Sequence, residues 1–145
     1  MKEEVIQQQL ADYLRLQYPD VIFHSDFGSG TKLTMGQAVK QKRLNGGKRA
    51  WPDMFIAETF TTDTDWEKDY PVFFGLFLEL KKDGTRLRKK NGEWASKHIA
   101  EQAQLIEQLK DRGYYAAFVV GFDEAKGLID TYLKGCIWLK DSSTR

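Results

Sequence analysis

The spacing of apolar residues predicts helices in three segments of the chain. Residues 2–17 carry apolar side chains at helical intervals, and Pro19 closes the segment. Residues 95–111 repeat the pattern and are followed by Gly113, a residue type common at helix ends. Residues 122–133 predict a last helix. These segments are long enough for each helix to cover part of a sheet.

Short apolar runs between and after the helices predict strands. They lie at residues 21–23, 54–57, 73–80 and 115–120, with a terminal apolar run at 137–139. The third run is apolar on both alternating faces, which is typical of a central strand covered on both sides. The order helix, three strands, helix, strand, helix predicts an α/β fold in which helices flank a mixed central sheet.

Three polar connections separate these elements. Residues 25–50 are rich in Gly, Lys and Arg, and we expect a long loop there. Residues 59–69 form an acidic, Thr-rich connection that predicts an exposed hairpin loop, and residues 83–92 form a basic loop. No repeat, linker or low-complexity tract interrupts the chain, so we expect one domain over residues 1–145.

Composition excludes several classes of protein. Hydrophobic residues make up 41% of the 145 residues and charged residues 30%, which is typical of a globular domain. The net charge of +1 argues against a uniformly basic protein that coats nucleic acid or membrane. A single cysteine, Cys136, excludes an internal disulfide framework. The polar start of the chain does not resemble a secretory signal, and no apolar stretch reaches the roughly 20 residues of a membrane helix.

Polar side chains occupy positions that the strand pattern reserves for the core. Alternation places Glu79 and Lys81 on the same face as Phe77, so a carboxylate and an ammonium continue an apolar row. Asp53 begins another apolar strand directly after Pro52. A salt bridge at a strand end and a turn carboxylate are the ordinary explanations. Because a hairpin brings the two strand ends together, we expect these three groups to lie close in space.

Two helices add polar residues to their apolar faces. Glu3 and Gln7 continue the face of the first helix toward its N-terminus, and Gln102 interrupts the apolar face of residues 95–111. A partly exposed edge position would explain each of them. A buried glutamine, however, needs hydrogen-bond partners. Together with the acidic pair and the lysine, these residues predict a shared polar pocket.

This combination of residue types suits phosphodiester hydrolysis. Asp53 and Glu79 could share one hard cation, Mg²⁺ or Mn²⁺, which retains water ligands and accepts a phosphate oxygen. Such a cation lowers the pKa of a bound water and neutralises charge on the phosphate. Lys81, on the same strand face as Glu79, could orient the attacking water.

The motifs resemble those of the PD-(D/E)xK nuclease superfamily, in which Pro52-Asp53 is followed by Glu79-Leu80-Lys81. Within it, the chain looks like a small stand-alone phage member of the virus-type replication-repair nuclease (VRR-NUC) family. The similarity spans almost the whole chain, including the Glu- and Gln-containing first helix, His24 and the segment around Gln102. One departure is that Ala50-Trp51 precede the Pro-Asp pair, where the family tends to have a glycine.

The resemblance implies a restriction-endonuclease-like αβββαβ core and metal-dependent nuclease activity. Asp53 and Glu79 would be metal ligands, with Glu3 as a third carboxylate near the metal. Glu4 is the alternative to Glu3, which we prefer because it aligns with Gln7. Further site residues implied by the resemblance are Lys81 as the water-positioning residue, Gln102 as the pocket glutamine, and His24, which would either touch the substrate or cap the edge of the site.

Family relatives suggest a substrate and a cellular setting. We expect a structure-selective endonuclease for branched DNA of the Holliday-junction or flap type, acting in phage or mobile-element DNA processing or repair, with a homodimer suited to a four-way junction. The expected location is the cytoplasm of a bacterial or phage-infected cell. Two alternatives are a less selective nicking or restriction-type nuclease of the same fold, and a degenerate member that only binds nucleic acid.

Charge is segregated along the chain despite its near-neutral sum. Basic residues crowd the connection before Asp53 and the connection after Lys81, whereas acidic residues gather between 58 and 69. A charged loop is ordinarily solvated surface. Because these two flank the expected site, we predict that they contact the DNA backbone and that binding weakens with salt. The expected contacts are Lys40, Lys42, Arg43, Lys48 and Arg49 before the site and Lys82, Arg86, Arg88, Lys89 and Lys90 after it.

Overall fold

The computed structural model describes residues 1–26, 32–48, 50–61 and 72–143, with the backbone alone at 61 and 136–143. Within these residues, no helix is both long and apolar enough to cross a membrane. The helices are α1 (Glu3–Gln17), α2 (Met35–Leu44), α3 (Lys97–Asp111) and α4 (Phe122–Ser143). The strands are β1 (Phe23–Ser25), β2 (Met54–Ile56), β3 (Phe60–Thr61), β4 (Val72–Phe73), β5 (Leu76–Lys81) and β6 (Tyr115–Val120).

A mixed four-stranded sheet forms the centre of the molecule, in the order β1-β2-β5-β6. The first three strands are antiparallel neighbours, and β5 pairs with β6 in parallel. The register aligns Met54 with Leu78 and Glu79 with Phe118. The predicted α/β class, the mixed sheet and the central position of the strand with Glu79 are therefore confirmed.

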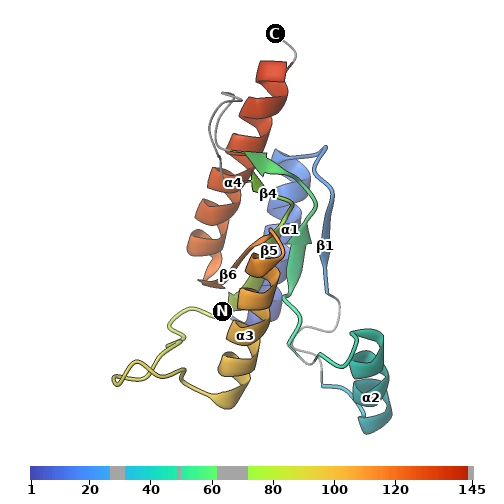
Figure 1. Cartoon of the computed structure of the whole chain (residues 1–145), viewed down its shortest axis with the longest axis vertical. Helices are drawn as coiled ribbons and strands as arrows, with labels where there is room; N and C mark the ends of the chain where they lie inside the picture. Colours follow the sequence, from blue (N-terminus) through green and yellow to red (C-terminus); the bar gives the residue numbers. More distant parts are fainter. Residues whose placement is uncertain (27–31, 49, 62–71, 144–145) are drawn as a thin grey trace.

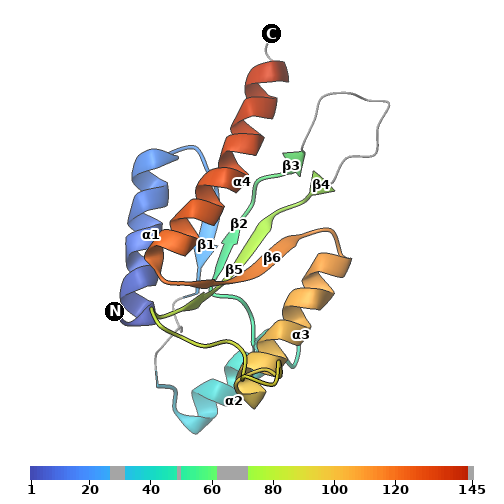
Figure 2. The same cartoon turned by 90° about the vertical axis from the view of Figure 1, so that its left-hand side faces the viewer.

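Helices cover both faces of this sheet. Figure 2 shows α1 and α4 on one side and α3 on the other. The alternating leucines of β5, such as Leu78, are fully buried in the core under α1 and α4. Phe77 points the opposite way and packs with Leu105 and Leu109 of α3. Glu79 and Lys81 follow Phe77 at intervals of two, so they belong to the face that α3 covers.

The prediction of a loop over residues 25–50 was wrong in one part, because this segment contains α2. A capping box begins the helix: the Thr34 side chain accepts from the Gln37 amide, and the Gln37 side chain accepts from the Thr34 amide. None of the α2 side chains is buried. The helix therefore has no apolar stripe facing a core, and periodicity could not detect it. Figure 1 shows α2 standing apart from the sheet.

The expected strand over 73–80 is two strands with different partners. Val72–Phe73 pairs with β3, whereas Leu76–Lys81 pairs with β2 and β6. Gly75 marks the change: a Cβ atom there would lie 2.6 Å from the Phe55 ring, closer than a side chain tolerates. The β3–β4 ladder agrees with the expected hairpin, although residues 62–71 lie outside the described part of the chain.

Two further boundaries differ from the sequence-based expectation. The first strand runs over Phe23–Ser25, two residues later than expected. The last helix continues to Ser143, so the apolar run at 137–139 belongs to α4 and is not a separate element. That run is too short for periodicity to distinguish a strand from a continuing helix.

A hydrogen-bonded cluster joins α1 to α4 at the end of α1 remote from Glu3. The Asp130 carboxylate accepts from the hydroxyl groups of Tyr13 and Tyr18 and from the Lys126 ammonium, the last at 3.0 Å. Burial alone would raise the pKa of Asp130, but these hydrogen bonds outweigh it and hold the pKa below the ordinary 3.8. The ionised form of Asp130 is therefore favoured in the folded protein.

We expect Asp130→Asn to lower the free energy of unfolding by about 1 to 3 kcal/mol, since it weakens three hydrogen bonds to a charged acceptor. A group whose pKa falls on folding contributes stability above its ordinary pKa and loses it as the pH falls through the lowered value. The difference between wild type and variant should thus be largest near pH 7 and shrink below about pH 4. Urea denaturation at several pH values measures this difference.

Asp12→Asn, at an exposed ion pair with Arg15, is the control and should change stability by less than about 0.5 kcal/mol. An equal loss in both variants would refute this role for Asp130.

Candidate active site

Asp53 and Glu79 meet where β2 begins and β5 ends. The antiparallel pairing of these strands brings Asp53 alongside the last residues of β5. The Leu80 amide donates a 2.7 Å hydrogen bond to Oδ2 of Asp53. Both acidic residues are buried, Asp53 with 8% and Glu79 with 4% of its surface exposed. Two carboxyl groups in such an environment are costly unless something compensates their charge.

Lys81 supplies a positive charge on the same face of β5. Its Nζ lies 3.9 Å from Oε1 of Glu79, and both side chains are buried. This distance is at the outer limit of an ion pair and too long for a hydrogen bond. The ammonium therefore acts on the acidic pair through its charge and not through a hydrogen bond to Glu79. The spatial proximity predicted for Asp53, Glu79 and Lys81 is found.

The two glutamines predicted to line the pocket both contact it, in different ways. Nε2 of Gln102 donates a 2.7 Å hydrogen bond to Oε1 of Glu79, linking α3 to the central strand. Gln7 donates instead to backbone carbonyls, to Asp26 at 2.9 Å and to Asp53 at 3.4 Å. Gln102 thus orients a carboxylate, whereas Gln7 supports the chain that carries one.

Asp26 is a neighbour of the site that the sequence did not indicate. Its amide donates a 2.8 Å hydrogen bond to the carbonyl of Asp53, and its own carbonyl accepts from Gln7. Backbone contacts of this kind leave no signature in residue type. The only available signal was its position one residue after β1, where the chain passes the start of β2.

The electrostatics of the site are dominated by Glu79. Burial raises its pKa to about 10, and the negative charge of Asp53 adds to the increase, while the Lys81 charge opposes it. The charge of Glu3 contributes a smaller increase. A carboxyl group with this pKa holds a proton at neutral pH, so it becomes a carboxylate only when a further positive charge compensates it.

The first helix directs one of its two acidic residues toward the site. Glu3 is partly buried and close enough for its charge to act on Glu79, whereas Glu4 is exposed. This favours Glu3 as the helix carboxylate. His24 lies on β1 opposite Phe55 and is exposed. The positions of Glu3 and His24 do not test whether they bind a metal or substrate, so the roles of both residues remain predictions.

The donor set of the site fits a hard divalent cation. Oε2 of Glu79 and Oε1 of Gln102 are buried and make no hydrogen bond within the described part of the chain. Among those residues, no three His, Cys, Asp or Glu side chains converge on one point. Mg²⁺ commonly uses only one or two protein carboxylates and completes its shell with water and substrate phosphate. Asp53 and Glu79 would provide that pair.

Basic residues lie on two projections at the end of the molecule where the site lies. Figures 1 and 2 show α2 and the connection between β5 and α3 at the end where α1 begins, and Figure 1 separates them on opposite sides of α3. All the described members of the predicted set are on or beside these projections: Lys40, Lys42, Arg43 and Lys48 at α2, and Lys82, Arg86, Arg88, Lys89 and Lys90 on the connection. Arg49 lies outside the described residues.

The connection after Lys81 is an ordered hairpin and not an open loop. Arg88 pairs with Trp94 as a β-bridge, and the Lys89 amide donates a 2.7 Å hydrogen bond to the Glu93 carbonyl. The Arg88 guanidinium stacks 3.8 Å from the centre of the Trp94 ring and donates to the Gly92 carbonyl. Arg88 therefore stabilises the basic hairpin (residues 82–95) from within.

Together these features define a restriction-endonuclease-like fold with two buried carboxyl groups and a lysine at the end of its central strands. No protein-family model matches the sequence, and no curated protein matches it. One solved structure, described as a VRR_NUC domain protein, superposes with a TM-score of 0.61 over 93% of this chain and 90% of that chain, at 22% sequence identity. The chain therefore has the fold of a VRR_NUC domain protein, as the sequence motifs had indicated.

Proposed function

We propose that this chain is a VRR-NUC family nuclease that hydrolyses phosphodiester bonds with the help of Mg²⁺ or Mn²⁺. The observation that carries the proposal is the burial of Asp53, Glu79 and Lys81 together at adjoining ends of β2 and β5. A protein that only used this region structurally would gain stability from apolar residues there. The presence of two acids and a lysine together in a buried site supports a chemical role.

Six residues of the candidate site have a role in the proposed reaction. A bound divalent cation supplies Lewis acidity and lowers the pKa of a bound water. Asp53 and Glu79 would hold the cation, and Glu3 would add a negative charge on the side of α1. Lys81 orients the attacking water and stabilises negative charge on the phosphate. Gln102 fixes the orientation of Glu79, and Gln7 fixes the backbone at Asp53.

The arrangement of positive charge supports DNA as the substrate. The two basic projections, α2 and the basic hairpin, lie on opposite sides of α3 at the end of the molecule where the site lies (Figure 1). A phosphate backbone crossing the site would pass between them. Half to two-thirds of the hydrogen bonds between proteins and DNA go to phosphate and sugar, and these contacts position the strand.

We propose branched DNA of the Holliday-junction or flap type as the preferred substrate, in phage or mobile-element DNA processing. A homodimer would present two sites to a four-way junction. The alternative is a less selective nicking or restriction-type nuclease of the same fold. The basic projections favour DNA binding in both cases, and substrate preference distinguishes the two.

A cleavage panel tests the proposed function. We expect wild-type protein with Mn²⁺ to cut a labelled four-way junction or flap at least about tenfold faster than linear duplex, and to cut nothing in EDTA. Equal cutting of branched and linear DNA would support the less selective nuclease. Binding without cleavage of any substrate, with either metal, would identify a nucleic-acid-binding module and overturn the proposal.

A further inference from the structure

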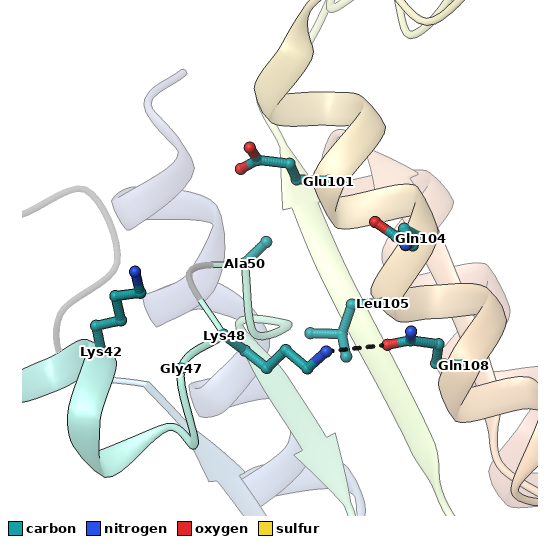
Figure 3. Close-up of a pocket in the computed structure, with 8 residues that line it drawn as sticks. All are labelled: Lys42, Gly47, Lys48, Ala50, Glu101, Gln104, Leu105 and Gln108. Atoms are coloured by element: carbon teal, nitrogen blue, oxygen red, sulfur yellow. Dashed lines mark hydrogen bonds between the residues drawn. The ribbon is translucent and has the colours of Figure 1, made fainter.

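The surface between α2 and the body of the protein contains two adjoining hollows. The outer hollow, about 220 Å³, lies between α2 and α3 and is the one drawn in Figure 3, where Lys48 reaches Gln108 at 3.5 Å. The inner hollow, about 450 Å³, lies between α2 and the end of β1. Lys42 and Lys48 line both. Neither is lined by Asp53, Glu79 or Lys81, so they are separate from the metal-binding residues.

A backbone hydrogen bond links the inner hollow to the candidate active site. Asp26 lines it, and the Asp26 amide donates to the carbonyl of Asp53. Trp51 also lines it and precedes Asp53 by two residues. A group held in this hollow would therefore lie beside a phosphate that reaches the metal ligands.

The chemistry of the inner hollow matches that of a nucleotide. Trp51 is 38% exposed and Val39 65% exposed, and both could pack against the face of a base. Gln41 and Asn45 present amide donors and acceptors, and Lys42 presents a positive charge. The hollow therefore offers apolar surface for the face of a base, amide groups for its polar edge and a positive charge for a phosphate.

The volume of the inner hollow limits the size of the ligand that it can bind. A volume of about 450 Å³ lies within the range of small-molecule sites, and a base inside a duplex is already stacked on both faces, so its face is not free to pack on Trp51. The helix α2, which buries none of its own side chains, would gain a packing partner from a bound base. We propose that the inner hollow binds one unpaired nucleotide next to the cleaved phosphate, an inference that rests on the proposed nuclease function.

An unpaired nucleotide is the feature of branched DNA that the chain would detect. A flap or an opened junction offers an unpaired nucleotide at the branch, and a continuous duplex does not. Base-on-aromatic stacking tolerates every base, so the site would read single-strandedness without reading sequence. Selectivity for branched DNA would then come from this single subsite.

Binding measurements with a Glu79→Gln protein in EDTA separate the subsite from catalysis. Trp51→Ala, added to this background, should weaken binding to a flapped duplex about tenfold and to a nicked duplex of the same length less than about twofold. Lys42→Ala, on a helix with no buried side chain, should weaken binding to the flapped duplex more than to the nicked duplex, because it loses a contact in the hollow as well as a contact to the DNA backbone. Lys110→Ala, an exposed lysine of α3 paired with Glu107, is the control and should change neither affinity.

A flap that lacks its first unpaired base distinguishes stacking from structural damage. Removing that base should weaken binding to the Glu79→Gln protein about as much as Trp51→Ala does, and should cause no further loss in the double variant. Equal loss on flapped and nicked DNA, or no effect of the missing base, would overturn the subsite. Failure of wild-type protein to cut any substrate would instead refute the nuclease function, because the binding comparison does not depend on cleavage.

Discussion

Glu79→Gln is expected to slow DNA cleavage by about a thousandfold or more, because a neutral amide lacks the negative charge with which a carboxylate holds the divalent cation. The same change should stabilise the cation-free protein by about 1 to 3 kcal/mol at pH 7. The Gln102 amide can still donate to the oxygen of the new side chain, so the packing is retained. Single-turnover cleavage with Mn²⁺ and thermal unfolding in EDTA measure the two effects.

The gain in stability should depend on pH in a defined direction. Burial and the charge of Asp53 raise the pKa of Glu79 from 4.5 to about 10 in the folded protein. A group whose pKa rises on folding contributes stability that is fully present below its ordinary pKa and is lost as the pH rises toward the raised value. Wild type should therefore match the variant near pH 4 and fall progressively behind it toward pH 9.

An exposed glutamate provides the control for this experiment. Glu107→Gln, on the surface of α3, removes the same charge without burial and should leave both cleavage and the pH profile unchanged. Cleavage by Glu79→Gln at the wild-type rate would refute the site. A pH-independent difference in stability would refute the electrostatic explanation while leaving the catalytic assignment intact.

Lys81→Met is expected to lower the cleavage rate about 100- to 1000-fold while leaving DNA affinity nearly unchanged. Lys81 is buried with Glu79 on one strand face, so we expect its ammonium to act at the reacting phosphate and not on the backbone of the duplex. Methionine retains the length of the apolar stem. Cleavage at saturating protein and binding by anisotropy separate rate from affinity.

Lys82 is the matched control for Lys81. Lys82 follows Lys81 but is exposed at the start of the basic hairpin. Lys82→Met should weaken binding and reduce its salt dependence, with the rate at saturation retained. If Lys81→Met instead lost affinity and kept its rate, the lysine would be a backbone contact and its positioning role would be excluded.

The central sheet and the site could be predicted because the sequence places charged residues at positions that the strand pattern assigns to the core. Glu79 and Lys81 continue an apolar row, and such residues are expensive to bury unless a site needs them. The proximity of Asp53 to these two residues followed from the order of the strands alone, because a hairpin places the start of one strand beside the end of the next. Gln102 was detectable for the same reason, as a polar residue on an apolar stripe.

The parts that were not predicted lack a signal of this kind. The helix α2 buries no side chain, so its only signature was the Thr34–Gln37 capping pair within a polar segment. The strand break at Gly75 depends on the position of the Phe55 ring in another strand. Asp26 acts through its backbone amide and carbonyl, which every residue has. Long-range contacts decided the strand break and the position of Asp26, which a local pattern cannot show.

The basic hairpin has a consequence for the thermodynamics of binding. Its backbone pairing and the stacking of Arg88 on Trp94 are internal, and Trp94 also contacts Phe118 of β6 at a ring separation of 5.7 Å. A segment that is already folded loses little conformational entropy when a ligand arrives, unlike a basic loop that orders on contact. The charges that follow Lys81 would then contribute to association without a large change in heat capacity.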